Sequence, residues 1–482
     1  MGDTEQAWKL FESSGLAQIS DSADALCLKG RLMKDSALKA SGEERDALFE
    51  RARSAYLAAS ELSPATYPLI NAATIGLLMG RREEAERAAD RIIAMLDSCE
   101  HEPETQYWLK ATRAEAYLLK GRERDARQAL AEAIRAAPAA WEDHASTLRH
   151  YRLILDVLGM SADWLDTLRP PSSLHFSGII NLAPDHDEVV RAIEAALESI
   201  APGFGFGTLA AGADIITAEI LLRRGAELHI ILPAAVDVFR QESVGRFGSQ
   251  WIPRFDRLLD RADAVEVLPD LDEVSEAGVL LADQMAMGLA IRQSRILEAR
   301  ACALRVGTAQ AARTAPRLLD RAWESQGLPI RRLDVTRAAS RGKPLPAFAS
   351  EVIIAMPASG AADALVAAGG VATEHGHHSI VCFADPVAAA RAAMDIAVGQ
   401  DIPVGAHYAA FNPSSAGADR FDVARLIANA APPGRVLLSR AMTLALALRG
   451  PEFGCESFGD IATPHGDIAL SILALRSRRE AG

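Results

Sequence analysis

Short apolar runs alternate with longer segments of helical periodicity in the middle of the chain. The apolar runs have the length of strands, and each intervening segment is long enough to carry the chain back to the same edge of a sheet. This alternation is typical of parallel βαβ crossovers. It predicts an α/β doubly wound parallel sheet with strands at 174–180, 227–233, 264–268, 301–305 and 331–335 and helices at 187–199, 212–224, 251–261 and 277–298.

The first 165 residues show helical periodicity and contain a weak internal repeat. The segments LLMGRREEA (77–85) and LLKGRERDA (118–126) are 41 residues apart, and each joins a helix ending at glycine to a second helix that opens with alanine. This is the helix-turn-helix pattern of tetratricopeptide repeats, whose usual period is about 34 residues. The block YPLINAA (67–73) resembles the tetratricopeptide-like TRAFs-binding region found beside signalling domains.

Stacked helix pairs of this kind leave a concave face, so we expect all-α TPR-like helical repeats that bind protein partners. A scaffold that only packs on the neighbouring domain is the alternative.

Composition restricts the classes of partner. At 482 residues the chain is predicted to form about three domains. A net charge of −13 argues against nucleic-acid or anionic-membrane surfaces, because both require a basic face. The sequence shows no membrane-spanning run and no apolar signal segment, and its five cysteines are scattered without a disulfide pattern. We therefore expect a cytoplasmic protein.

A glycine-rich segment follows the first predicted crossover helix. It reads GFGTLAAGAD from 205 to 214, and Ala218-Glu219, Arg224-Gly225 and Leu232-Pro233 come after it. This series resembles the SLOG family, whose Rossmann-like domains bind nucleotides or nucleotide-derived ligands. Glycines let a backbone approach a phosphate, and the N–H groups that open the next helix favour its charge. The predicted ligand-binding residues are Ser177, Gly178, Gly205, Gly207, Gly212, Asp214, Glu219, Arg240 and Ser243.

Structural interpretations of the same residues stay open. A glycine-rich turn between a strand and a helix is often only tight packing, and Asp214 is also a suitable helix cap. The segment GIINLAP (178–184) is apolar where SLOG relatives carry charged ligand-facing residues. No cofactor is assigned beyond a nucleotide-derived ligand.

The last third of the chain carries a series of motifs in fixed order. These are VCFADPVAAAR (381–391), IPVGAHY (402–408), APPGRVLLS (431–439) and EFGCESFG (452–459). Their order resembles the catalytic domain of class III adenylate/guanylate cyclases. The resemblance implies an α+β, ferredoxin-like domain and an active site that forms between two subunits.

The metal-binding carboxylates of that family are missing here. The resemblance implies one carboxylate at the end of the strand VIIAMPASG (352–360), where Ser359 or Gly360 stands, and another in a hairpin where His377 stands. In the helix that serves the ribose and the transition state, Asp422 replaces asparagine and Arg425 remains. Hydroxyl and imidazole groups are poor Mg²⁺ ligands. We predict a cyclase fold without cyclase chemistry; the alternative is a cyclase active only as a heterodimer with a competent chain.

Two further expectations concern metal and assembly. His375, His377, His378 and His407 match no standard zinc spacing, so no metal site is predicted. The segment 441–448 is rich in alanine and leucine, and it predicts an apolar face for a homodimer. The expected domains are the helical repeats at 1–168, the SLOG-like domain at 170–338 and the cyclase-like domain at 350–477.

Overall fold

The computed structural model describes residues 4–180, 182, 187–268, 273–307, 314–335, 345–346, 348–357, 361–375, 377–414, 418–463 and 466–476. The chain divides into two compact units. One comprises residues 2–170 with 296–298, and the other comprises 171–295 with 299–482.

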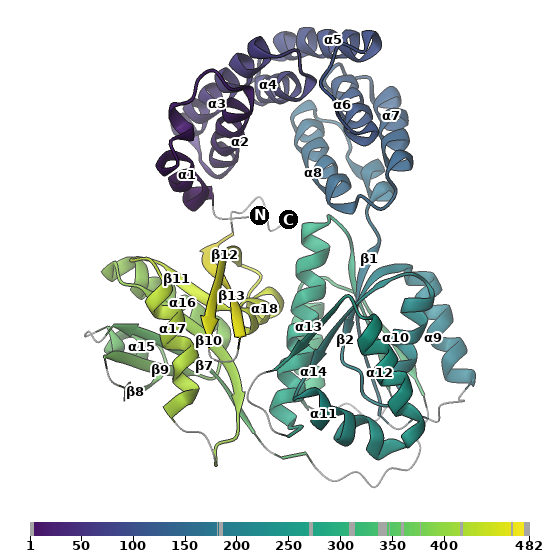
Figure 1. Ribbon diagram of the computed structural model, residues 1–482, viewed down its shortest axis with the longest axis vertical. Helices are drawn as coiled ribbons and strands as arrows, with labels where there is room; N and C mark the ends of the chain where they lie inside the picture. Colours follow the sequence, from purple (N-terminus) through teal and green to yellow (C-terminus); the bar gives the residue numbers. More distant parts are fainter. Residues whose placement is uncertain are drawn as a thin grey trace. The chain divides into compact units, whose positions relative to one another are not determined.

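The first unit is helical, as expected. Its helices are α1 (Thr4–Ser13), α2 (Ala23–Lys39), α3 (Gly42–Leu62), α4 (Thr66–Leu78), α5 (Arg82–Ser98), α6 (Gln106–Leu119), α7 (Glu123–Ala136) and α8 (Trp141–Leu158). Consecutive helices pack as hairpins placed side by side (Figure 1). Among the described helices, none combines the length and apolar character that crossing a membrane requires.

The internal repeat builds two equivalent turns, one between α4 and α5 and one between α6 and α7. Gly80 and Gly121 have positive φ angles of 78° and 69°. The N–H of Arg81 donates to the carbonyl of Gly76, and that of Arg122 donates to the carbonyl of Tyr117, both at 2.9 Å. The repeated sequence therefore encodes the same turn twice.

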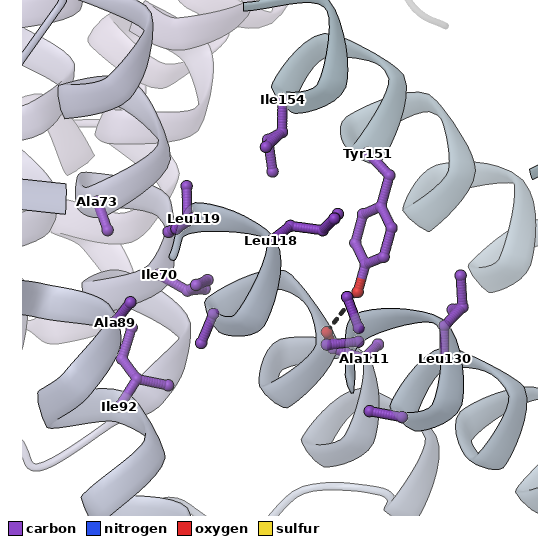
Figure 2. Packing of buried hydrophobic residues seen from close by; sticks show 14 of the residues in the cluster. Ile70, Ala73, Ala89, Ile92, Ala111, Leu118, Leu119, Leu130, Tyr151 and Ile154 are labelled. Atoms are coloured by element: carbon purple, nitrogen blue, oxygen red, sulfur yellow. Dashed lines mark hydrogen bonds between the residues drawn. The ribbon is translucent and has the colours of Figure 1, made fainter. Parts of the chain in front are cut away.

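The core of this unit passes continuously from one hairpin to the next. Figure 2 shows Ile70, Ala89, Leu118 and Leu130 in one packed cluster. Tyr151 of α8 reaches across it, and its hydroxyl donates to the carbonyl of Ala111 at 2.7 Å. Each hairpin thus depends on its neighbour to bury its apolar face.

The second unit begins with the predicted parallel sheet. The described strands are β1 (Ser172–Gly178), β2 (Pro202–Gly207), β3 (Glu227–Leu232), β4 (Ala264–Val267), β5 (Ala301–Gly307) and β6 (Ile330–Asp334). All neighbouring pairs are parallel, in the order β4-β3-β2-β1-β5-β6. This confirms the doubly wound α/β class.

Helices cover both faces of this sheet (Figure 1). On one side lie α13 (Glu276–Ile296) and α14 (Thr314–Glu324), and on the other lie α9 (Asp187–Ile200), α10 (Ala213–Arg223) and α12 (Ile252–Arg261). The short helix α11 (Val236–Phe239) follows β3. Because the chain returns from β4 to β5 beside β1, the direction of winding reverses between β1 and β5.

The glycine-rich segment differs from its expected conformation. The segment 205–214 is predicted as a turn between a strand and a helix, but its first three residues belong to strand β2, all of whose positions are buried. A Cβ atom on Gly205 would lie 2.6 Å from Cδ1 of Leu221 in α10, and one on Gly207 would lie 2.5 Å from the carbonyl oxygen of Phe176. These glycines therefore allow α10 and β1 to approach β2 closely.

A mixed sheet follows. It confirms the α+β class that is expected for the last third of the chain. The described strands are β7 (Ala349–Pro357), β8 (Val371–His375), β9 (His378–Phe383), β10 (Val404–Phe411), β11 (Val436–Ser439), β12 (Phe453–Thr463) and β13 (Gly466–Leu475). Their order is β12-β13-β11-β10-β7-β9-β8. The helices are α15 (Ala362–Ala367), α16 (Pro386–Gln400), α17 (Asp422–Ala430) and α18 (Arg440–Arg449).

The segment predicted as a dimer face is covered within the chain. Residues 442–448 of α18 are buried. A Cβ on Gly288 of α13 would lie 2.3 Å from the carbonyl oxygen of Leu444, so the two helices touch at a glycine. The amide nitrogen of Gln326 donates to the carbonyls of Ala447 and Leu448 at 3.1 and 2.5 Å. The apolar residues of α18 therefore offer no free surface to a second copy.

We predict that Gly207→Ala destabilises the parallel sheet by about 1–3 kcal/mol, because the added methyl group meets a backbone carbonyl that cannot move aside. Hydrogen exchange of peptides from β1 and β2 measures this loss. Gly399→Ala is the matched control: Gly399 ends α16 with no atom within 4 Å of a new Cβ. It should stabilise by about 0.5–1 kcal/mol, since alanine favours helix. Equal protection in both variants would contradict the packing role of Gly207.

Candidate functional site

The carboxyl edge of the parallel sheet between β1 and β5 is the candidate site. In open α/β sheets, ligands bind where the winding direction reverses. Here β1 ends at Ser177 and Gly178, which pair with Arg305 and Val306 of β5. Of the predicted residues, Ser177, Gly178, Gly212 and Asp214 lie at or beside this edge.

Asp214 ties this edge together. Its carboxylate accepts the N–H of Gly178 at 2.8 Å, the hydroxyl of Thr208 at 2.6 Å and the N–H of Ala210 at 3.3 Å. One side chain thus joins the end of β1, the loop after β2 and the first turn of α10. Asp214 is 3% exposed, so it acts as an internal anchor for the site.

Burial sets the ionisation of this anchor. Removal of the carboxylate from water raises the pKa of Asp214 to about 7, even though the three hydrogen bonds favour the charged form. The Asp214 carboxyl group therefore gains or loses its proton near neutral pH, whereas an exposed aspartate is ionised throughout that range.

Glycine is required at two positions around this anchor. Gly212 precedes α10 with φ +115°, a conformation that L side chains rarely adopt. A Cβ on Gly178 would lie 2.3 Å from the Cβ of Ala213. The end of β1 and the start of α10 are therefore in direct contact, and the residue types at both positions are fixed by packing.

A second polar group lies on the other face of β1, under α13 and α14. Nη1 of Arg305 donates to Nδ1 of His175 at 2.7 Å, and Nε donates to Asp320 at 2.9 Å. Nε2 of His175 lies 2.9 Å from Oδ1 of Asp283, a close contact without good hydrogen-bond alignment. The four side chains form a chain of alternating partners from α14 to α13.

This arrangement keeps His175 neutral. An arginine can only donate, so Nδ1 of His175 must accept and the proton must sit on Nε2, facing Asp283. Burial lowers the pKa of His175, against the opposing charge of Asp283, and Arg305 lowers it further. Burial would raise the pKa of Asp283, but its contacts with His175 and Arg305 outweigh that effect and hold the pKa below its usual value.

Nη2 of Arg305 is a hydrogen-bond donor without a strong acceptor at the sheet edge. The only recorded partner of Nη2, among the residues that the structure describes, is the sulfur of Met287 at 3.6 Å, and thioether sulfur is a weak acceptor. The side chain is 14% exposed. Because Ser177 and Arg305 are register partners on parallel strands, they project to the same face. A hydroxyl and a fixed guanidinium together suit the recognition of a phosphate or carboxylate.

Three other predicted residues have partners within the chain. Glu219 binds Arg254 of α12 with both carboxylate oxygens, at 2.8 and 2.5 Å. Arg240 binds Asp256 in the same two-pronged way, at 2.8 Å each. Ser243 is buried, and its carbonyl accepts the N–H of Ala211. These contacts hold α10, α12 and the loop after β2 in place.

Sequence reasoning missed His175, Arg305, Asp283 and Asp320. The signal was present, since His175 stands between Leu174 and Phe176 in one strand, and Arg305 stands between two apolar residues in the strand ACALRVG (301–307). A buried polar residue in such a strand requires a partner. The sequence contains no pattern that pairs strands 130 residues apart.

The proposed cyclase positions are placed in part. Pro357, at the end of β7, pairs with His378 of β9, and Gly360 lies outside the described residues. His377 is exposed, and Ser359 also lies outside the described residues. Within the described part of the chain, no group of three or more His, Cys, Asp or Glu side chains is placed to hold a metal ion.

The remaining cyclase-type positions are on α17. Arg425 pairs with Asp422 at 2.9 Å, and its Nε and Nη2 atoms are buried with no hydrogen-bond partner among the described residues. Nδ1 of His407 in β10 likewise has no partner in the described part of the chain, and burial lowers the pKa of His407 to about 4. His407 is therefore neutral at physiological pH.

Comparison with known proteins finds a family model that matches the first part of the N-terminal helical region. Residues 1–78 match the family model described as Tetratricopeptide Repeats-Sensor, TPR-S. This supports an N-terminal TPR-Sensor region, and the resemblance of residues 67–73 to a TRAFs-binding region stays a prediction. The search of curated proteins found no match.

Solved structures of cyclases are similar to part of the chain. An adenylate/guanylate cyclase/hydrolase from Silicibacter pomeroyi has 16% identity and a TM-score of 0.24, and covers 27% of this chain and 100% of its own. The adenylyl cyclase CyaB from P. aeruginosa has 15% identity and a TM-score of 0.22, with 28% and 98% coverage. The guanylyl cyclase Cya2 has 11% identity and a TM-score of 0.22, with 27% and 95% coverage. At these identities and TM-scores, the likeness carries no conclusion about activity.

Proposed function

We propose that this chain is a signalling or regulatory protein that binds a nucleotide-type ligand at the carboxyl edge of its parallel sheet. Its N-terminal helices bind protein partners, and its C-terminal domain lacks cyclase chemistry. The match of residues 1–78 to a family described as a sensor supports a signalling role.

The pairing of Ser177 with Arg305 carries this proposal. Both residues lie at the point where the sheet reverses its winding, and Arg305 is held by Asp320 and His175 so that its free donor has a fixed position. A preorganised guanidinium loses little conformational entropy when it binds an anion.

The absence of carboxylates supports the proposal for the C-terminal domain. Two divalent ions bound by carboxylates would be needed to activate a hydroxyl nucleophile and neutralise a triphosphate. In the sequence, Ser359 or Gly360 and His377 stand at the positions where the resemblance implies those carboxylates. The proposed role of this domain is regulatory, and a homodimer would require a face other than α18.

We predict that ATP, GTP or ADP-ribose binds the purified full chain and that Ser177→Ala weakens binding about tenfold, since one hydrogen bond to a charged group is lost. Arg305→Lys should weaken it at least as much, because lysine cannot reproduce the planar donor pair. Isothermal titration calorimetry measures both. Arg331→Gln, an exposed position on β6, is the control and should bind normally. Unchanged affinity in Ser177→Ala and Arg305→Lys would rule out this edge.

We also predict a pH-dependent effect of Asp214→Asn on local stability. The pKa of Asp214 lies above that of an unfolded aspartate, so the folded chain holds an extra proton between pH 4 and 7. The stability that this extra proton contributes is fully present below the pKa of the unfolded aspartate, and it is lost as the pH rises through about 7. Hydrogen exchange of peptides 172–180 and 205–215 should therefore show that the native protein's advantage over Asp214→Asn shrinks from pH 5 to pH 8. Asp237→Asn, on exposed α11, should show no such trend.

The homomeric protein should form no cyclic nucleotide. Purified chain incubated with ATP or GTP and Mn²⁺ is expected to give no cyclic AMP or cyclic GMP above the uncatalysed level by chromatography. Product at enzyme-like rates would overturn the proposal for the C-terminal domain. Product only after addition of a competent cyclase chain would favour the heterodimer.

A further inference from the structure

Three arginines gather where the parallel-sheet domain meets the mixed-sheet domain within the second unit. Arg292 and Arg295 lie one turn apart near the end of α13, and Arg476 follows β13. All three lie close enough to the thiol of Cys455 in β12 to act on it electrostatically, and Cγ of Arg476 would lie 3.6 Å from a Cβ on the neighbouring Gly454. We call these three residues the arginine cluster.

The cluster contains no paired carboxylate. Among the residues that the structure describes, Arg292 and Arg476 make no side-chain hydrogen bond or ion pair. Nη2 of Arg295 donates to the amide oxygen of Gln326 at 2.8 Å, while its Nη1 is buried without a partner. A nearby acid, Glu266, is bound to Arg440 at 2.7 Å, and Glu452 is bound to Arg391 at 2.9 Å.

Gathering like charges away from water is unfavourable. Burial lowers the pKa of Arg295 to about 10, and the charges of Arg476 and Arg292 add to that effect. Burial also lowers the pKa of Arg292, with Arg440 and Arg476 contributing in the same direction. The arrangement is therefore strained electrostatically unless an anion is present.

We propose that the arginine cluster is a binding site for a phosphate-type oxyanion, either free or carried by a small metabolite. A multivalent oxyanion accepts several guanidinium hydrogen bonds at once, and it would satisfy the buried Nη1 of Arg295. Because Arg476 belongs to the mixed-sheet domain and the other two arginines to the parallel-sheet domain, the bound anion links the two domains.

This site is separate from the edge described above. Asp283 of α13 contacts His175 in the first site, and Arg295 lies 12 residues further along the same helix, about 18 Å at 1.5 Å per residue. The two sites can therefore be tested independently in one protein.

The test is titration of the full chain with pyrophosphate and with ribose 5-phosphate at constant ionic strength, followed by calorimetry and thermal shift. Both ligands should bind, and the tighter one distinguishes a free phosphate from one carried by a metabolite. Arg292→Gln and Arg476→Gln should each weaken binding at least tenfold. Arg261→Gln, an exposed and unpaired arginine of α12, should leave it unchanged.

Thermal stability without ligand separates a binding role from a structural one. If the cluster repels itself, Arg292→Gln should leave the Tm unchanged or raise it, while removing the shift caused by pyrophosphate. A lower Tm with the pyrophosphate shift intact would show that Arg292 is structural and overturn the proposal. Binding that survives in both variants but is lost in Ser177→Ala would place the anion at the sheet edge, which also overturns it.

Discussion

The buried carboxylate of Asp214 is the interaction on which the candidate site depends. It collects donors from the end of β1, from the loop after β2 and from a hydroxyl beside that loop. Without this acceptor, the backbone N–H groups that it binds would be buried without hydrogen-bond partners. Replacing the acceptor leaves those donors unsatisfied, which costs more than the bonds contribute when present. The edge therefore keeps one conformation because a single charged group satisfies it.

A helix covers the same sheet from the other face and links the proposed sites. α13 contributes Asp283 to the contact with His175 and, five residues later, Gly288 to the contact with Leu444 of α18. Arg292 and Arg295 of the arginine cluster follow about one and two turns beyond Gly288. Since interdigitated helices do not deform continuously, we expect that a shift of one end of α13 also moves its other end. This gives a physical route by which a ligand at the sheet edge would act on the C-terminal domain.

Glycine determines how closely these elements approach one another. Gly207 lies against the carbonyl of Phe176, and Gly288 lies against the carbonyl of Leu444. At each position a methyl group would meet backbone, which cannot rotate away as a side chain can. Loss of ligand binding in a bulky Gly207 variant would therefore report disrupted packing, and Ser177 and Arg305 are the better probes of the edge.

The classes of the first two domains followed from period and spacing, which are local properties of the sequence, whereas the class of the third followed from a resemblance between motifs. Alternating apolar runs predicted the parallel sheet, and the repeat LLMGRREEA/LLKGRERDA predicted two equivalent helical turns. Tertiary structure decided the rest. The glycine-rich segment from Gly205 was predicted as a turn because glycine disfavours strands, yet Phe176 and Leu221 require glycine at positions 205 and 207 of β2. The apolar run at 441–448 has the same composition whether it faces a second copy or α13, and Gly288 selects α13. His175 meets Arg305 only because β1 and β5 are adjacent, and adjacency of distant strands is a property of the folded sheet.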